Sequence, residues 1–438
     1  MSRLLAHASL ALAIFVPVTI ASADDWPQWM GPSRDDVWHE TGILKEFPKD
    51  GPKIVWRAPV SGGYAGPAVA QGRVYVTDFL TEGDKANDPG KKSELKGNER
   101  ILCFDENDGK LLWKYEYPCE YKISYPAGPR ATPTINDGKV YTLGAEGNLV
   151  CLDAGTGKLV WEKDLKKEYN IQAPHWGFSG HPLVDGDKLF TLVGGEGSVA
   201  VAFDKNTGKE IWRALSATEP GYAPPTMIEA GGTKQLLQWS SEALNSLDPN
   251  TGKVYWTIPL KPDYGMSIMA PRQQGNYLFA SGVGDQSLLL ELDAKEPSAK
   301  EVWRGTNKTA IYCVNSTPVV DGETMYGVDR MGQLRGVTLA TGKRLWETLK
   351  PTTGNRPANS GTAFLTKNGD QYFLFSETGD LVIAKLSPEG YEEMSRAHLV
   401  DQTNEAFGRE VVWSHPAYAN KKVFIRNDKE IVAASLAD

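Results

Sequence analysis

The chain has 438 residues, a formal net charge of −8 at pH 7 and four cysteines. This acidic balance lacks the basic patch with which proteins bind nucleic acid. Beyond the N-terminus, no stretch is apolar for long enough to span a bilayer as a helix. The sequence therefore argues against a nucleic-acid-binding protein and against a helical membrane protein.

The first residues have the pattern of a secretory signal peptide. Arg3 supplies a positive charge, residues 4–20 are mostly apolar, and Ala21-Ser22-Ala23 gives a small-x-small cleavage pattern. We expect residues 1–23 to be removed and the mature protein to be periplasmic or secreted. A membrane anchor is the alternative, but Pro17 interrupts the stretch, which is short for a spanning helix. No cysteine lies near the cleavage site, so lipid attachment is not expected there.

One short motif recurs along the chain and reads Asp-x-x-Thr-Gly-Lys-x-x-Trp. It is complete at residues 153–161, 204–212 and 248–256, and a variant at 105–113 has Asp108 in place of the threonine. The tryptophans of the complete, variant, degenerate and partial copies are Trp56, Trp113, Trp161, Trp212, Trp256, Trp303 and Trp346. A period of about 50 residues predicts an array of repeated units rather than a fold with a single core.

The copy between residues 133 and 162 indicates what each unit contains. Asp137-Gly138 and Glu146-Gly147 are turn signals between short runs with strand character, and the motif itself is a third hairpin turn. Each unit is therefore a four-stranded antiparallel sheet, with strands A to D counted from the inside outward. A phosphate-binding loop is the alternative interpretation of Thr-Gly-Lys, but no Gly-Lys is followed by Ser or Thr.

The number of units follows from the residues that open strand A. These are Pro67, Pro133, Pro182, Pro225, Pro271, Pro318, Thr362 and Pro416. The last opening is followed by three strands only, whereas residues 53–57 form one lone strand that contains Trp56. We therefore predict an all-β fold: one eight-bladed β-propeller over residues 24–438, whose ring is closed by the N-terminal strand.

Two segments depart from the repeat. Residues 78–100 are rich in Lys, Glu, Gly and Asn, and we expect an exposed loop inserted in the first blade; a solvated loop and a partner contact are both open. Residues 24–52 precede the closing strand. Their aromatic, proline-containing part, residues 26–38, is expected to pack against the propeller as a plug or brace.

The four cysteines, Cys103, Cys119, Cys151 and Cys313, show no disulfide framework. Cys103 and Cys151 occupy the same position in neighbouring repeats. We therefore expect each of these two to be a buried free thiol.

A ligand site is expected at the mouth of the central channel, where the D–A and B–C connections of a propeller meet. The side chains expected there, just before the strand A openings or in the B–C loops, are Tyr64, Arg130, His175, Trp176, His181, Tyr222, Asn315, Asp329, Arg330, Asn359 and His415. Residues 175–181 are the densest group, with two histidines, two aromatic residues and three small residues. They suit a stacked planar ligand or a peptide side chain; simple packing of the channel entrance is the alternative.

No motif predicts catalysis or a resident metal ion. His181 and His415 lie three blades apart, which is too far for them to share an ion. A calcium site of carboxylate and amide oxygens is conceivable, but no compact ligand loop is present. Neither Gly-x-Ser-x-Gly nor His-Glu-x-x-His occurs, so no catalytic residue is assigned.

The repeat resembles that of a known family. Residues 152–161, Leu-Asp-Ala-Gly-Thr-Gly-Lys-Leu-Val-Trp, are similar to the tryptophan-docking repeat of pyrroloquinoline-quinone-type propellers. This superfamily includes quinoprotein alcohol dehydrogenases and the propeller lipoprotein that assists outer-membrane barrel assembly. The opening residues 25–34 also resemble the start of secreted quinoprotein-like propellers of planctomycete-type bacteria, in which the position of Met30 is often Arg. The resemblance covers nearly the whole mature chain and implies the propeller fold.

The chain departs from both activities in this superfamily. The adjacent cysteine pair that many quinoprotein dehydrogenases place against the cofactor is missing, and so is a Cys-x-x-Cys-His site for haem. Asn315 and Asp329 are the nearest counterparts of calcium ligands, by blade position only. The lipidated cysteine of the assembly lipoprotein is also missing.

These observations favour an exported, non-catalytic binding or scaffold protein, with a protein or peptide partner in the cell envelope. We expect a monomer without a cofactor. The alternative is a dehydrogenase that uses pyrroloquinoline quinone with calcium to oxidise alcohols or sugars. A third hypothesis, a carbohydrate- or polymer-degrading role for the aromatic mouth, has no specific support in the sequence.

Overall fold

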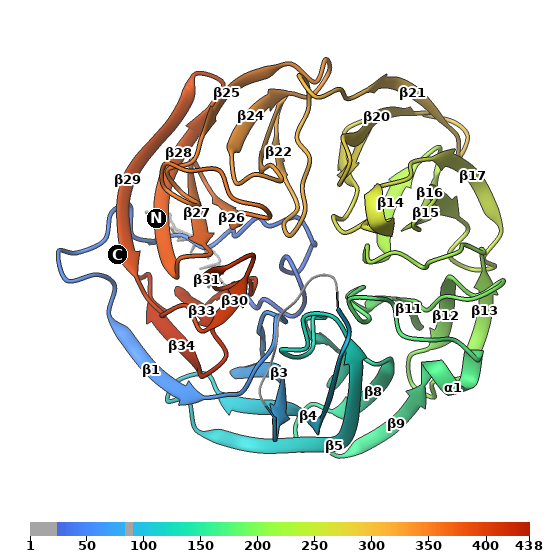
Figure 1. The fold of residues 1–438 in the computed structure, drawn as a ribbon, viewed down its shortest axis with the longest axis horizontal. Coiled ribbons are helices and arrows are strands. Elements are labelled where there is room, and N and C mark those ends of the chain that lie inside the picture. The colour runs from blue at the N-terminus through green and yellow to red at the C-terminus, as the bar shows by residue number, and fades with distance from the viewer. Residues whose placement is uncertain (1–23, 84–90) are drawn as a thin grey trace, which may run out of the picture.

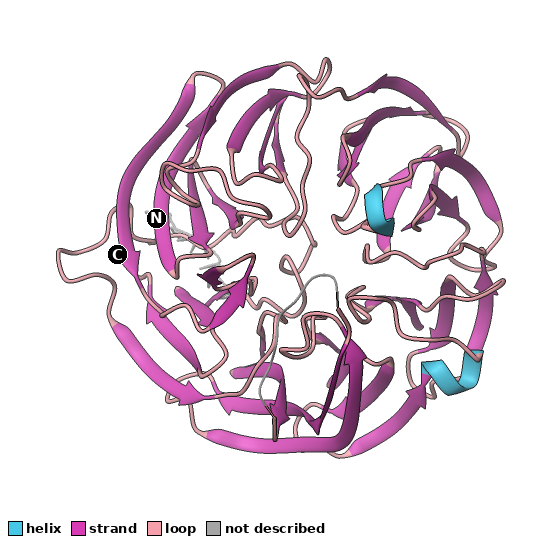
Figure 2. Ribbon diagram, in the orientation of Figure 1, coloured by secondary structure: helices cyan, strands magenta, loops and turns pink. Residues whose placement is uncertain are grey.

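The computed structural model describes residues 24–83 and 91–438. The predicted signal peptide, residues 1–23, lies outside the described residues and stays a prediction. Nearly all regular structure is strand, and Figures 1 and 2 show the sheets arranged around a common centre. There are eight four-stranded sheets, each with neighbouring strands in sequence order except the one that contains both chain ends. The prediction of an eight-bladed β-propeller is confirmed.

The blades are numbered in chain order, and the strands of each blade are named from the inside outward. Blades 1 to 4 consist of β2 (Ala68–Ala70), β3 (Arg73–Thr81), β4 (Ser93–Asp105) and β5 (Leu111–Ile123); β6 (Thr134–Asn136), β7 (Lys139–Leu143), β8 (Asn148–Asp153) and β9 (Leu159–Asp164); β10 (Leu183–Asp185), β11 (Lys188–Leu192), β12 (Ala200–Asp204) and β13 (Glu210–Ala214); and β14 (Thr226–Ala230), β15 (Thr233–Trp239), β16 (Ala243–Leu247) and β17 (Val254–Pro259).

Blades 5 to 8 consist of β18 (Arg272–Gln274), β19 (Tyr277–Gly282), β20 (Gln286–Leu292) and β21 (Ala299–Arg304); β22 (Val319–Asp321), β23 (Thr324–Val328), β24 (Leu334–Thr338) and β25 (Arg344–Thr348); β26 (Ala363–Asn368), β27 (Gln371–Ser376), β28 (Asp380–Ser387) and β29 (Gly390–His398); and β32 (Ala417–Ala419), β33 (Lys422–Arg426), β34 (Glu430–Ser435) and β1 (Ile54–Pro59). A separate hairpin of β30 (Asn404–Ala406) and β31 (Arg409–Val411) lies between blades 7 and 8. The helices are one short turn each, α1 (Leu165–Tyr169) and η1 (Asp263–Gly265). Neither these nor any other helix within the described residues has the length and apolar character needed to cross a membrane.

Blade 8 is built from both ends of the chain. Strand β1 pairs antiparallel with β34, from Ile54 opposite Ala434 to Pro59 opposite Glu430. Figure 1 shows the blue β1 beside the red β34. The predicted closure by the N-terminal strand is therefore confirmed.

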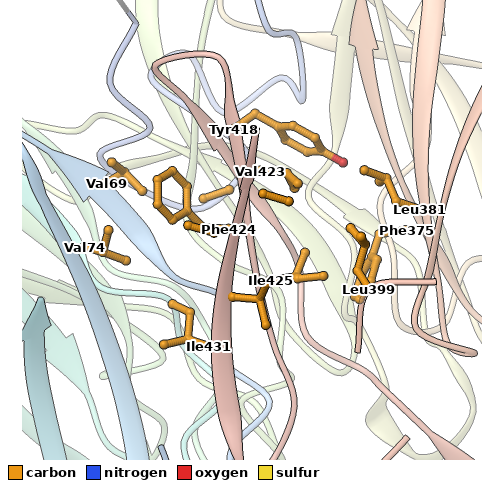
Figure 3. Close-up of a cluster of buried hydrophobic side chains, with 14 of the residues drawn as sticks. Val69, Val74, Phe375, Leu381, Leu399, Tyr418, Val423, Phe424, Ile425 and Ile431 are labelled. Atoms are coloured by element: carbon orange, nitrogen blue, oxygen red, sulfur yellow. The ribbon is translucent and has the colours of Figure 1, made fainter. Parts of the chain in front are cut away.

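The core lies between neighbouring blades. Strands β33 and β34 are buried along most of their length, because both faces of an inner strand pack against adjacent sheets. Figure 3 shows one such cluster, in which Phe424 and Ile431 of blade 8 lie between Val74 of blade 1 and Phe375 of blade 7. Burying apolar side chains from three blades in one cluster holds those blades together.

Six of the repeat tryptophans link one blade to the next. Six indole N–H groups donate to a backbone carbonyl in or beside the C–D turn of the following blade; these bonds are Trp56 to Glu106 (2.8 Å), Trp113 to Ala154 (3.1 Å), Trp161 to Lys205 (3.0 Å), Trp212 to Pro249 (3.0 Å), Trp303 to Leu339 (3.1 Å) and Trp346 to Ser387 (2.9 Å). Trp256 differs, because its indole donates to the Gln235 side chain of its own blade at 3.1 Å. The corresponding turn of blade 5, residues 293–298, contains no glycine on which the ring could lie.

The segment 78–100 corrects the sequence prediction of an inserted loop. Strand β3 continues to Thr81 and β4 begins at Ser93, so most of the segment is a paired hairpin. The reason is that β5 continues beside β4 as far as Ile123 and gives the polar strand a partner. Phe79 is buried against Tyr121, with ring centroids 4.0 Å apart, and the buried Glu99 carboxylate accepts a hydrogen bond from the Tyr121 hydroxyl at 2.5 Å.

All four cysteines are buried and unbridged, as expected for Cys103 and Cys151. Burial raises the pKa of each of these two thiols to about 12. They are therefore unreactive thiols that belong to the packing between blades.

Glycines beneath the indole rings should be more sensitive to substitution than glycines in open turns. Gly208 has a φ of +69°, and a Cβ there would lie 2.8 Å from Cδ2 of Trp161. Gly232 has a φ of +70° with nothing within 4 Å of the added Cβ, so it is a matched control. We expect Gly232→Ala to lower the free energy of unfolding by about 1–2 kcal/mol, because of the left-handed backbone alone. Gly208→Ala should lower it by a further 1–3 kcal/mol or so, because the methyl group also displaces the ring.

Urea unfolding of the two variants measures this difference. Equal losses of unfolding free energy in the two variants would show that the packing of the indole does not require a glycine beneath the ring.

Candidate functional site

A cavity of about 770 Å³ opens at the mouth of the central channel. Ten of the eleven predicted site residues line it, namely Tyr64, Arg130, His175, Trp176, His181, Tyr222, Asn315, Arg330, Asn359 and His415. They come together because most of them precede a strand A, where each D–A connection enters the ring. That they bind a ligand stays a prediction.

Asp329 is the predicted residue that does not line the cavity. Its side chain is buried, lies 2.6 Å from the Arg335 guanidinium and accepts a hydrogen bond from the Tyr312 amide at 3.1 Å. Burial raises the pKa of Asp329, although the Arg335 charge opposes that effect. The carboxylate therefore serves the packing of blade 6 and is not directed into the cavity.

Aromatic rings dominate the lining. Nine Trp, Tyr and Phe side chains face the cavity: Trp29, Tyr64, Tyr125, Trp176, Tyr222, Tyr264, Phe364, Phe407 and Trp413. Trp176 packs edge-on against Tyr222 with centroids 5.6 Å apart, and Tyr125 lies 6.1 Å from Trp413. Large aromatic faces with a few polar groups between them are typical of ligand pockets and of the anchor points of protein interfaces.

Sequence reasoning missed several of these rings. Tyr264 and Phe407 lie in connections that follow no repeat, so their position in the sequence could not place them at the mouth. Trp29 comes from the N-terminal segment, and the aromatic composition of residues 26–38 was the signal that could have found it. Trp413 is not among the missed rings, because it lies just upstream of a strand A opening and the comparison that selects His415 also places Trp413 at the mouth.

The floor of the cavity is Trp29. Its ring stacks on His181 with centroids 4.4 Å apart and an interplanar angle of 7°, and it meets the His415 ring edge-on at 6.2 Å. The two histidines therefore hold Trp29 between them, at the level where strands A begin.

His181 is neutral. Its Nδ1 accepts a hydrogen bond from the Thr132 backbone N–H at 2.9 Å, which requires that nitrogen to be unprotonated. Burial lowers the pKa of His181 well below its ordinary value, and the nearby charges of Arg34 and His415 act in the same direction. The Thr132 hydroxyl is itself buried and has no hydrogen-bond partner, so it is a polar group that a ligand can satisfy.

The surroundings of His415 favour its protonated form. Its Nδ1 lies 2.9 Å from the Pro416 carbonyl, which can only accept, so this nitrogen carries a proton. Its Nε2 forms an ion pair of 3.2 Å with the buried Asp36 carboxylate, although the two groups are poorly aligned for a hydrogen bond. Burial opposes the charge, but the Asp36 carboxylate outweighs it and raises the pKa of His415. The pKa values of the two histidines beside Trp29 are thus shifted in opposite directions.

Arg130 shapes one wall. Its half-buried guanidinium donates to the backbone carbonyls of Ser124 (2.9 Å) and Tyr125 (2.6 Å) and lies 5.2 Å from the centroid of the Tyr64 ring. Burial lowers its pKa. Because its partners are main-chain carbonyls of the connection between blades 1 and 2, Arg130 fixes the path of that connection.

The rim carries strained, exposed aromatic residues. Tyr264 is 75% exposed and Phe407, at the tip of the β30–β31 hairpin, is 44% exposed. Their φ angles are +59° and +52°, a left-handed conformation that bulky residues rarely adopt. Tyr125 and Ser360, which also line the cavity, have φ angles of +51° and +54°. Such strain persists only where the surrounding structure enforces it, and it gathers at functional sites.

The donor set of the cavity does not fit a calcium-bound quinone. Calcium takes six to eight or so oxygen ligands, usually with several carboxylates among them. Glu219, on the exposed rim, is the one carboxylate that lines the cavity within the described residues, and Asp329 is committed to Arg335. Across residues 24–83 and 91–438, no group of three or more His, Cys, Asp or Glu side chains converges as a metal site.

The repeat, the indole contacts and the eight blades define a propeller of the pyrroloquinoline-quinone-like class. The family profile described as "Outer membrane protein assembly factor BamB" matches residues 97–348, which is more than half of the chain. The chain belongs to this family.

Known proteins agree with this assignment. The outer membrane protein assembly factor BamB of Shewanella oneidensis is 23% identical over 271 residues, which cover 55% of this chain and 66% of that protein, just under two thirds of its length. The crystal structure of BamB from Moraxella catarrhalis matches 87% of this chain and 97% of its own, with a TM-score of 0.57 and 15% identity. The quinohemoprotein alcohol dehydrogenase of Comamonas testosteroni matches 94% of this chain and 80% of its own, with a TM-score of 0.63 and 15% identity. At these identities the two solved structures show the fold alone.

The charge on His415 should make stability depend on pH. The folded protein binds this proton more tightly than the unfolded chain, in which His415 titrates near an ordinary pKa of about 6.5. Its contribution is therefore fully present below that pH and is lost as the pH rises through the higher folded pKa. We expect the free energy of unfolding to fall over this interval by at most about 1.4 kcal/mol per pH unit from this residue.

Urea unfolding between pH 5.5 and pH 9 or so tests this assignment. His415→Gln and Asp36→Asn should both remove this component, because each eliminates one member of the pair. A slope that is the same in the wild type and in both variants would contradict the assignment of the proton to His415.

Proposed function

We propose that this protein is a non-catalytic binding propeller of the cell envelope, whose aromatic mouth receives a segment of a partner protein during envelope assembly. The observation that carries the proposal is the contrast between the groups that line the cavity. His415, Arg130 and Nδ1 of His181 are engaged with the scaffold, whereas nine aromatic side chains line the space.

The engaged groups include those that would otherwise suggest catalysis. Both nitrogens of His415 have partners, and Nδ1 of His181 is occupied by a backbone N–H. Arg130 bonds to main-chain carbonyls. General acid–base catalysis requires a titratable group that can reach the substrate proton, and these groups are turned to structural contacts instead.

The exposed rim suits a protein partner. Tyr264 and Phe407 project from different connections, and aromatic residues of this kind dominate the energetics of protein interfaces. The name of the family, and of its Shewanella oneidensis member, is that of an outer membrane protein assembly factor, which supports a partner in the envelope. The predicted signal peptide would place the protein in the same compartment, the periplasm.

Site-specific photo-cross-linking tests the mouth as the contact surface. Benzoylphenylalanine in place of Tyr264, at the rim, should form an adduct with an envelope protein in cells. The same substitution of Tyr255, on the outer strand of blade 4, is the matched control and should form none. Phe407→Ala in the Tyr264-substituted protein should lower the adduct yield severalfold, because it removes a second anchor from the same surface.

The proposal fails if the two positions cross-link equally or if Tyr264 forms no adduct. An adduct at Tyr264 that is insensitive to Phe407→Ala would place the contact outside the cavity rim.

The alternative function, a quinone-dependent dehydrogenase, makes a separate prediction. Because the cavity offers no convergent carboxylates, we expect titration of the mature protein with pyrroloquinoline quinone to give no saturable heat, with or without calcium. Glu219→Gln should give the same result, since one rim carboxylate cannot assemble a calcium site. Saturable binding of one equivalent at micromolar affinity or better would overturn the non-catalytic assignment and direct attention to alcohols and sugars as substrates.

A further inference from the structure

The N-terminal strap, which comprises residues 25–38, crosses the channel beneath the cavity. It begins against the first two blades. Trp26 exchanges two backbone hydrogen bonds of 2.8 Å with Val69 of β2, and the Ile135 amide of β6 donates to the Pro27 carbonyl at 2.8 Å. The strap is thus paired with inner strands on one side of the ring.

The middle of the strap is fastened to blades 3, 4 and 5. The guanidinium of the half-buried Arg34 donates to the carbonyls of Pro182 (2.5 Å) and Pro225 (3.0 Å), where β10 and β14 begin. Arg272 of β18 donates in turn to the carbonyls of Arg34 (2.7 Å) and Asp35 (2.9 Å). Burial lowers the pKa of Arg34 to about 9, because its partners are carbonyl oxygens rather than carboxylates.

The far end of the strap is fastened to blades 7 and 8. The amide of Trp38 and the carbonyl of Asp36 both bond to Lys367 of β26 at 2.8 Å, and the Asp36 carboxylate forms the ion pair with His415. The strap therefore touches the inner edges of seven blades.

The backbone of the strap is strained where it crosses the channel. Met30, Arg34 and Asp36 have φ angles of +62°, +55° and +57°, although none of them is glycine. Each such residue costs about 1–2 kcal/mol relative to an ordinary conformation. Strained backbone that many contacts enforce is typical of functional sites. Trp29 is the one side chain of the strap that lines the cavity.

We propose that the strap is part of the binding site and that Trp29 is its specificity-determining residue: the ligand seats on the Trp29 ring, and the strap fixes how deep the ligand can go. His181 stacks on one face of this ring and His415 meets it edge-on, so removal of the indole leaves a gap between the two histidines. The site is accordingly built from the propeller and from a segment outside every blade. This inference rests on the proposed function only in taking the cavity as the place where a partner's side chain binds.

Two neutral aromatic alcohols of different size, 2-naphthol and 1-pyrenemethanol, are suitable probes of cavity depth in the full mature protein. Replacing Trp29 with Leu lowers the floor. We expect the affinity for 1-pyrenemethanol relative to 2-naphthol to rise by roughly tenfold, the gain for burying about 60 Å² more of apolar surface. Trp29→Phe, which keeps an aromatic floor, should change the ratio by less than about threefold by the same reasoning.

Trp38→Leu is the matched control. Trp38 lies on the same strap and is equally buried, but it packs against Phe373 and Tyr418 and does not line the cavity. Its substitution loosens the strap without altering the floor, so the affinity ratio should stay at the wild-type value. Calorimetry or probe fluorescence gives both affinities for each variant.

The inference is overturned if Trp29→Leu leaves the ratio unchanged, if Trp38→Leu shifts it as much, or if neither probe binds to the wild type and the Trp29 variants. These results are separable from those of cross-linking at Tyr264. A shifted ratio without an adduct would retain Trp29 as the floor and reject the protein partner, whereas an adduct with an unchanged ratio would reject Trp29 alone.

Discussion

The contact between an indole ring of one blade and the turn backbone of the next sets the geometry on which the rest of this protein depends. An outer strand has an open edge, so the angle between two neighbouring blades must be fixed by something other than sheet hydrogen bonds. The indole is a rigid planar group, and its N–H donates in one direction only. The glycine beneath the ring has no side chain, so the ring packs on the backbone and sets the distance between the two blades. Repeated around the circle, this contact sets the width of the channel and so the size of the cavity at its mouth.

The places where this contact is missing support the same account. Strand β29 of blade 7 carries no tryptophan, and the blade that follows it has no C–D turn, because the two ends of the chain lie at that position. An indole there would have no turn to contact. The cluster around Phe424 and Ile431, which joins blades 7, 8 and 1, takes over the linkage. Between blades 7 and 8, where no indole contacts a turn, the burial of apolar side chains nearer the channel therefore holds the two blades together.

What the sequence could predict follows from how local each signal is. Strands, turns and blade number were accessible because Asp-x-x-Thr-Gly-Lys specifies a hairpin within a few residues. Most of the mouth residues were accessible because their distance from a strand A opening is nearly constant. Tyr264 and Phe407 were not, since their connections have individual lengths and paths. Asp329 was wrongly predicted to line the cavity, because its position in the repeat does not indicate that its carboxylate forms an ion pair with Arg335.

Long-range pairing explains the other differences. The polar composition of residues 78–100 gave no indication that β5 would extend far enough to pair with them, or that Phe79 would be buried against Tyr121. Similarly, composition marked residues 26–38 as aromatic but could not indicate which ring would face the cavity. Only the contacts of the strap with inner strands from both halves of the chain select Trp29.

The composition of blade 8 has a consequence for how the molecule is made. Its outer strand β1 precedes every other described strand in the sequence and its neighbour β34 follows them all, so the ring stays open until β34 has been made. Bringing such distant partners together carries a large loop-closure entropy and makes this pairing a late step of folding. Until then both edges of the gap are exposed to other strands. Loss of β1 and loss of β34 thus damage one and the same sheet, so a copy that lacks either strand remains an open arc.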